Sequence, residues 1–198
     1  MMRNKTYYQV ILALTVVFGP AILVSAQTVQ GEKARNPGFE TAPQTADEIV
    51  ADWEVYSTHS PAISRQATSS YSGNYGLMLC TQNKKSAYTC LIQNHEVTPG
   101  VTYQFTARII NNRNDPLQGT AHGKLTVEWL NENGGEISRD AGEQWDANLS
   151  RMVWLRHRFD FQAPPKAVEA RFVVLFSDGD MPAQGSCFLD DISIREME

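Results

Sequence analysis

The chain has 198 residues, of which 17 are lysine or arginine and 22 are aspartate or glutamate, so its formal net charge is −5. A chain of this length can form one domain with a sizeable hydrophobic core. Its acidic balance argues against nucleic acid and anionic membranes as partners, and is compatible with neutral partners such as sugars.

The first 26 residues have the pattern of a secretory signal peptide. Arg3 and Lys5 precede an apolar run over residues 10–24, and small residues lead to a cleavage position after Ala26. A retained membrane anchor is the alternative, but a Gly-Pro pair interrupts the run, which is shorter than the roughly 20 residues that a spanning helix needs. The removed part holds two basic residues and no acids, so the mature charge is 15 − 22 = −7. We expect a secreted or periplasmic protein that is not attached to a membrane.

A polar leader over residues 27–35 is followed by short segments in which apolar and polar residues alternate. The clearest segments are residues 101–110, 124–130, 153–161, 170–176 and 187–195. A period of two is typical of β-strands with one face on a core, and turn sequences rich in Gly, Pro, Asn and Asp separate the segments. The sequence therefore predicts one all-β domain, a sandwich or barrel, over residues 36–195.

Export permits disulfides, and the chain has three cysteines. Cys80 and Cys90 flank a polar turn at residues 83–86. If the flanking segments form a hairpin, the two cysteines lie nearly opposite each other, and a disulfide there would stabilise the fold by about 2–3 kcal/mol. The alternative is two buried free thiols. Cys187 is expected to be buried and reduced.

Several motifs follow one another in a recognisable order between residues 36 and 194. The order is Asn-Pro-Gly-Phe-Glu at 36–40, Ser-Gly-Asn-Tyr at 72–75, Val-Thr-Pro-Gly at 97–100 and Phe-Leu-Asp-Asp-Ile at 188–192. This order resembles the CenC-like carbohydrate-binding modules of the cellulose- and xylan-binding type. The resemblance implies a galactose-binding-like jelly roll, a β-sandwich of about nine strands with the first and last strands side by side.

The resemblance also implies a structural Ca²⁺ ion near the terminal strands. The carboxylates of Glu40 and Asp190, with carbonyl oxygens around Ser72 and Asn74, would hold it. Calcium takes six to eight oxygen ligands, and an inward-facing Asp190 would be costly without a partner. The alternative is that both carboxylates cap backbone amides at strand ends.

A sugar site needs aromatic faces and polar side chains. Strand parity places Trp154 and Arg156 on one outward face, and the other strands add polar groups if they are neighbours. The candidate ligand-binding residues are Tyr56, Gln104, Arg108, Glu128, Trp145, Trp154 and Arg156. Trp145 is flanked by acids and is expected at an exposed rim, whereas Trp53, Tyr103 and Trp129 are assigned to the core. In the alternatives, Trp154 lies beneath a loop, and the arginines form surface salt bridges with Glu128 or Asp160.

The sequence thus predicts an exported, non-catalytic, monomeric protein that binds a polysaccharide weakly. A structural or adhesive sandwich without sugar binding is the main alternative, and a polysaccharide hydrolase is another. A hydrolase needs two carboxylates across a cleft. Glu128 is the only acid in a predicted strand interior that faces away from the core, and its expected neighbours are Thr126 and arginines.

Overall fold

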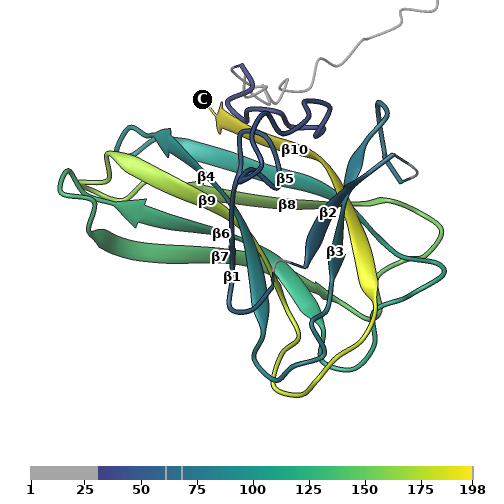
Figure 1. Ribbon diagram of the computed structural model, residues 1–198. Helices are drawn as coiled ribbons and strands as arrows, with labels where there is room; N and C mark the ends of the chain where they lie inside the picture. The colour runs from purple at the N-terminus through teal and green to yellow at the C-terminus, as the bar shows by residue number, and fades with distance from the viewer. Residues whose placement is uncertain (1–30, 61, 68, 198) are drawn as a thin grey trace, which may run out of the picture.

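The computed structural model describes residues 31–60, 62–67 and 69–197. Ten strands form two five-stranded sheets that pack against each other (Figure 1). The strands are β1 (Glu54–Ser57), β2 (Ile63–Gln66), β3 (Gly76–Cys80), β4 (Tyr88–Glu96), β5 (Thr102–Asn111), β6 (His122–Leu130), β7 (Glu136–Asp146), β8 (Leu155–Gln162), β9 (Glu169–Ser177) and β10 (Ser186–Met197). The expected signal peptide, residues 1–26, lies outside the described residues.

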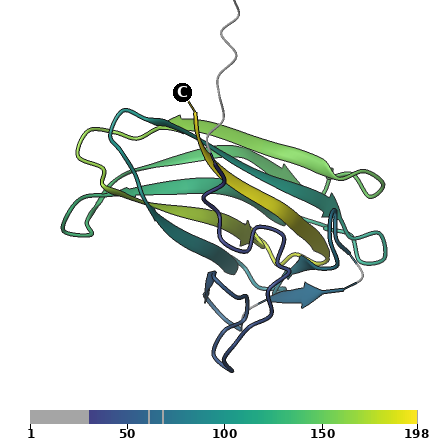
Figure 2. The ribbon, with the colours of Figure 1, turned by 90° about the horizontal axis from the view of Figure 1, so that it is seen from above.

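The first sheet has the strand order β1-β4-β9-β6-β7, and the second has the order β2-β3-β10-β5-β8. Neighbouring strands within each sheet are antiparallel. Figure 2 shows the two layers from above. The five alternating segments of the sequence correspond to β5, β6, β8, β9 and β10, and the predicted all-β sandwich is confirmed. Within the described ranges, no helix could cross a membrane.

The core lies between the sheets, where the apolar faces of the strands meet. Tyr103 and Phe105 of β5, Trp129 of β6 and Phe172 of β9 are completely buried. Tyr103 and Trp129, which come from opposite sheets, pack with ring centroids 6.4 Å apart. Trp53 is also buried. The assignment of Trp53, Tyr103 and Trp129 to the core is therefore confirmed.

The N-terminal segment lies beside the last strand, near the C-terminus in Figure 1. The backbone N–H of Lys33 donates to the carbonyl of Ile194 at 2.9 Å. In return, the Ile194 N–H donates to Oε1 of Glu32 at 2.7 Å. The N-terminal segment and the last strand are thus joined side by side by hydrogen bonds.

The predicted disulfide between Cys80 and Cys90 is wrong. Cys80 belongs to β3 in the second sheet, opposite Ser186, whereas Cys90 belongs to β4 in the first sheet, opposite Leu175. The intervening turn carries the chain from one sheet to the other and does not close a hairpin. All three cysteines are free, and Cys187 is completely buried as expected.

We expect the stability of the protein to depend on pH because of His95, the histidine of β4. Burial, with help from Arg35 and Lys33, lowers the pKa of His95 from 6.5 to about 4. The unfolded chain takes up a proton near pH 6.5, while the folded protein does so near pH 4. This contribution to stability is therefore present above about pH 6.5 and is lost as the pH falls towards 4.

We expect the melting temperature of His95→Gln to fall less than that of the wild type between about pH 7 and pH 5. His59, which is exposed, provides the control, because His59→Gln should follow the wild type. Thermal melts across this range check the prediction, and parallel curves for His95→Gln and the wild type would refute it.

Candidate functional site

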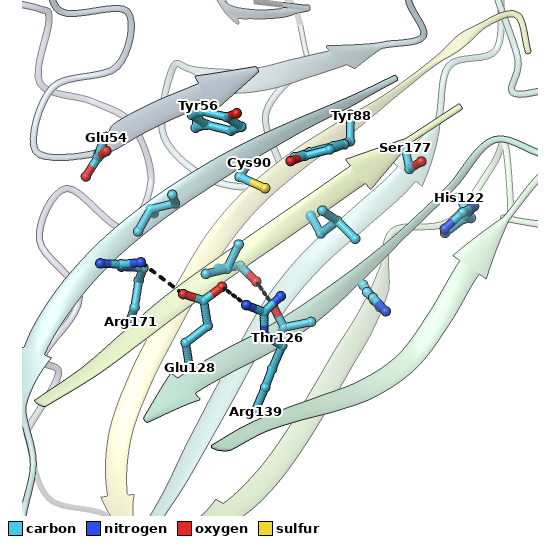
Figure 3. Close-up of a pocket in the computed structure, with 14 residues that line it drawn as sticks. Glu54, Tyr56, Tyr88, Cys90, His122, Thr126, Glu128, Arg139, Arg171 and Ser177 are labelled. Carbon is cyan, nitrogen blue, oxygen red and sulfur yellow. Dashed lines mark hydrogen bonds and ion pairs between the residues drawn. The ribbon is translucent and has the colours of Figure 1, made fainter. Parts of the chain in front are cut away.

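The outer face of the first sheet is hollowed into a groove of about 560 Å³ (Figure 3). Because side chains alternate along a strand, every second residue of the strands reaches this face. The lining residues are Glu54 and Tyr56 of β1; Tyr88, Cys90 and Ile92 of β4; Arg171, Val173, Leu175 and Ser177 of β9; His122, Lys124, Thr126 and Glu128 of β6; and Arg139 of β7. All five strands of the sheet thus contribute to one concave surface.

A charged clamp lies in the groove, centred on Glu128 (Figure 3). Its Oε1 lies 2.8 Å from Nη2 of Arg139, and its Oε2 lies 3.0 Å from Nη1 of Arg171. The Glu128 side chain is only 13% exposed, so the two guanidiniums offset the cost of its burial. The expectation that arginines would surround Glu128 is confirmed, although they come from β7 and β9.

Arg139 is the more strongly held of the two arginines. It also pairs with Glu136, at 3.1 Å, and Glu136 and Glu128 together raise its pKa above the usual value. Its side chain nevertheless remains 53% exposed. A fixed and accessible guanidinium can donate hydrogen bonds to a ligand without being reordered.

Two tyrosines lie on the opposite side of the groove from the clamp (Figure 3). Tyr56 is 51% exposed, and its ring centroid lies 5.9 Å from that of Tyr88 at an interplanar angle of 36°. Desolvation and the neighbouring Tyr56 raise the pKa of Tyr88, so the Tyr88 phenol is neutral near pH 7. The pair offers a ligand an aromatic surface with hydroxyls at its edge.

Apolar side chains from the two middle strands separate the tyrosines from the clamp. Cys90 and Ile92 come from β4, and Val173 and Leu175 come from β9. Burial, with Glu128 nearby, raises the pKa of the Cys90 thiol to about 11, so the thiol stays protonated and is a weak nucleophile. The groove thus combines three parts: an aromatic ledge formed by Tyr56 and Tyr88, an apolar floor formed by these side chains of β4 and β9, and the charged clamp around Glu128.

The structure divides the predicted ligand-binding residues between two faces. Tyr56 and Glu128 lie in the groove of the first sheet. Gln104, Arg108 and Arg156 lie on the outer face of the second sheet, where Arg108 is directly opposite Arg156. The strands that carry the predicted polar groups therefore do not form one sheet surface, because β6 belongs to a different sheet from β5 and β8.

Trp154 precedes β8 and is half-buried, with its ring 6.0 Å from that of Tyr71 in an edge-on arrangement. The alternative of surface salt bridges holds for Arg158, which pairs with Asp160. Arg156 instead donates to Oε1 of Gln104 at 3.3 Å.

Trp145 does not lie at an exposed rim. It is 2% exposed and packs against His157 with ring centroids 5.1 Å apart. Its position in β7 turns the ring toward the core, although the residues around it are mostly exposed. The prediction that Trp145 contacts a ligand from the surface is therefore wrong.

The residues expected to hold calcium meet in the loop before β3, where their carboxylates accept backbone amides. Asp190 Oδ2 accepts the N–H groups of Tyr71 and Ser72, at 2.6 and 3.0 Å. Glu40 Oε1 accepts the N–H groups of Asn74 and Tyr75, at 2.8 and 3.0 Å, and these bonds lower the Glu40 pKa.

These contacts are the ones expected of amide caps. Gly73 has a φ of 63°, and a Cβ there would clash with Oε1 of Glu40, so glycine permits the close approach. Among the described residues, no group of three or more His, Cys, Asp or Glu side chains is arranged to hold a metal ion. Carbonyl oxygens would have to complete any calcium shell, and calcium binding stays a prediction.

Sequence reasoning missed most of the polar or aromatic residues of the groove, among them Tyr88, Lys124, Arg139 and Arg171. Arg171 and Lys124 each alternate with core residues along their strands, so parity alone could have placed them on an outward face. Only the strand order of the sheet brings Arg171 and Arg139 to Glu128 from opposite sides.

No family model and no curated protein matches the chain in sequence, but solved structures match its fold. The CBM22-1 xylan-binding domain from Paenibacillus barcinonensis Xyn10C matches with a TM-score of 0.57 at 15% identity, over 87% of this chain and 97% of that domain. TmCBM61, solved with β-1,4-galactotriose, matches with a TM-score of 0.54 at 16% identity, over 83% and 98%.

A third match is the enzymatically active domain of tailspike protein 4 from bacteriophage CBA120. The TM-score is 0.60 at 12% identity, over 83% of this chain, which spans only 21% of the length of that chain. Identities this low show the fold alone. The chain has the β-sandwich fold of carbohydrate-binding modules, as its motif order predicted.

Proposed function

We propose that this protein binds a polysaccharide, without catalysis, in the groove of the first sheet. The observation that carries the proposal is the pair formed by the exposed Tyr56 and the half-buried Tyr88, which faces the Glu128 clamp across an apolar floor. Pyranose rings present apolar faces that pack on aromatic rings, and hydroxyls that accept and donate hydrogen bonds. The solved neighbours, a xylan-binding domain and a module in complex with galactotriose, support this ligand class.

The dimensions of the groove suit a chain of sugars. Its lining residues come from all five strands, so it crosses four inter-strand spacings of about 4.8 Å, or about 19 Å in total. One aromatic contact is worth about 0.5–1.5 kcal/mol beyond its buried area. Two such contacts and a few hydrogen bonds give an affinity on the order of micromolar to millimolar.

The groove does not favour hydrolysis. A glycosidase needs one protonated carboxyl and a second carboxylate across the scissile bond. Both oxygens of Glu128 are held in ion pairs with guanidiniums, so neither is free to act on a glycosidic bond. Glu54 is the other acid that lines the groove, and it lies on the edge strand β1.

One observation favours the adhesive alternative. Met152, Val153 and Leu155 are 73%, 59% and 41% exposed just before and at the start of β8. Such an exposed apolar segment can mark a protein contact. This segment covers the end of the loop before β8 and the first residue of the strand, whereas the groove offers both the aromatic and the polar groups that a sugar requires.

Affinity electrophoresis of the purified protein tests the proposal. Gels that contain xylan, β-glucan or β-galactan should retard the protein relative to a gel without polysaccharide. Retardation on at least one neutral gel is expected, and unchanged mobility on all of them would contradict polysaccharide binding.

We propose in addition that residues 1–26 direct export, so that N-terminal sequencing of the exported protein should begin at Gln27. A chain that retains residue 1 would contradict this proposal.

We also keep structural calcium as a proposal for the loop held by Glu40 and Asp190. The support is that three acidic side chains pass close to Gly38, where a Cβ would lie 3.8 Å from Oδ1 of Asp190, 3.9 Å from Oδ1 of Asp191 and 3.9 Å from the Cγ methylene of Glu40. Calcium would neutralise this concentration of charge. Chelator should then lower the melting temperature of calcium-treated protein, whereas equal melting temperatures would leave the carboxylates as amide caps only.

A further inference from the structure

We propose a second, anion-binding site on the outer face of the second sheet, formed by Arg108 and Arg156, that takes the carboxylate of an acidic sugar residue. The site is independent of the groove, because the two lie on opposite faces of the sandwich. Both arginines line a polar depression of about 370 Å³.

The strand register brings the two arginines together. Arg108 of β5 is directly opposite Arg156 of β8, so the two side chains leave the same face of the sheet. Residues in such pairs have Cβ atoms about 4.5–5.5 Å apart, and like charges there are destabilising. An anion between the two guanidiniums would remove the repulsion and accept hydrogen bonds from both.

Neither guanidinium forms an ion pair within the described part of the chain. Arg139, Arg158, Arg171 and Arg195 each pair with a carboxylate, whereas no carboxylate of the described residues lies within 4.0 Å of Arg108 or Arg156. Arg156 donates only to the amide oxygen of Gln104, at 3.3 Å. The guanidinium of Arg108 lies over the ring of Tyr71, 4.5 Å from its centroid.

The acids near this face already have other partners. Asp190 is opposite Arg108 on β10, but its carboxylate accepts the N–H groups of Tyr71, Ser72 and Asp191. Asp191 accepts the Ser72 hydroxyl at 2.6 Å, and Glu32 pairs with Arg195. The donors of Arg108 and Arg156 therefore remain for an external acceptor.

The surroundings of the arginines favour a sugar acid over a simple ion. Tyr71 is 45% exposed and lies between Arg108 and the half-buried Trp154. Thr106 and Ser193, opposite each other on β5 and β10, add hydroxyls to the depression. Aromatic surface beside paired guanidiniums matches a pyranose ring that carries a carboxylate, which arginine can bind through two parallel hydrogen bonds.

Isothermal titration of the purified protein with oligogalacturonate, with the matching neutral galacto-oligosaccharide and with inorganic sulfate tests the proposal. We expect Arg156→Gln to weaken oligogalacturonate binding by about tenfold or more and to leave neutral-sugar binding unchanged. Arg113→Gln, at an exposed loop position, is the matched control and should change neither. Tyr56→Ala should affect the neutral sugar and spare the uronate, which separates this site from the groove.

Equal affinity of the wild type and Arg156→Gln for oligogalacturonate, or no binding of it at low salt, would overturn the proposal. Tighter binding of inorganic sulfate than of oligogalacturonate would show a general anion site, and would also overturn the assignment to sugar acids. Arg156→Gln removes a like-charge contact, so its melting temperature without ligand should equal or exceed that of the wild type.

Discussion

Replacing Asp190 with alanine is expected to lower the free energy of unfolding by about 3 kcal/mol, because three backbone N–H groups lose their acceptor at a buried site. Asp190 is completely buried, and its carboxylate accepts the amides of Tyr71, Ser72 and Asp191. For a domain of this size the loss corresponds to a fall in melting temperature of about 6–12 °C. Urea denaturation in the presence of chelator measures the effect without any contribution from calcium.

The neighbouring Asp191 provides the control. Among the described residues its carboxylate bonds only the Ser72 hydroxyl, and its φ of 46° is a conformation that asparagine tolerates. Asp191→Asn should therefore lower the free energy of unfolding by less than about 0.5 kcal/mol. The loss for Asp190→Asn should lie between those for Asp191→Asn and Asp190→Ala, because one carboxylate oxygen is replaced by a donor. A loss for Asp190→Ala as small as that for Asp191→Asn would contradict the capping role.

Replacing Tyr56 with alanine is expected to weaken polysaccharide binding by roughly thirtyfold, because about 2 kcal/mol of aromatic contact and buried area is lost. Tyr56 is 51% exposed in β1, an edge strand, so the replacement should change stability little. Titration calorimetry with a soluble oligosaccharide that the protein binds measures the change in Kd.

Tyr56→Phe is the matched control, since it keeps the ring and removes only the hydroxyl. It should retain most of the affinity. If Tyr56→Ala binds as tightly as the wild type, the aromatic ledge does not contact the sugar.

Sequence pattern predicted the fold well wherever a strand has one face on the core. In β5, β6 and β9 every second residue is apolar and buried, so the period of two was visible. Strand β7 escaped prediction because it is an edge strand. Its first nine residues are exposed or only partly buried, and five of its eleven residues are charged. Edge strands often carry such charges, which discourage pairing with other chains.

The errors in the candidate sites arose from the strand order, which local pattern does not contain. The turn after Cys80 resembles a hairpin in sequence, but it joins the two sheets and separates Cys80 from Cys90. Glu128 has the parity of a groove residue, yet its partners Arg139 and Arg171 come from β7 and β9. Acids beside Trp145 suggested exposure, although its own parity turns the ring inward.

A bulge explains a further difference at Asp190. The register of β10 against β5 shifts between Asp190 and Ser193, and Asp191 there has a positive φ. Ile192 and Ile194 face the core beyond the shift, whereas Asp190 is buried against the loop amides of Tyr71 and Ser72. The prediction of an inward-facing Asp190 depends on counting every second residue along this strand, and an inserted residue breaks such counting.

The central claim is that the groove of the first sheet binds a polysaccharide, and amide chemical-shift mapping tests it most directly. Titration with an oligosaccharide that the protein binds should shift the amide resonances of Tyr56, Tyr88 and Arg171, on three adjacent strands. It should leave the resonances of β5 and β8 unchanged. Shifts confined to the second sheet, or no shifts with any neutral oligosaccharide, would contradict the claim.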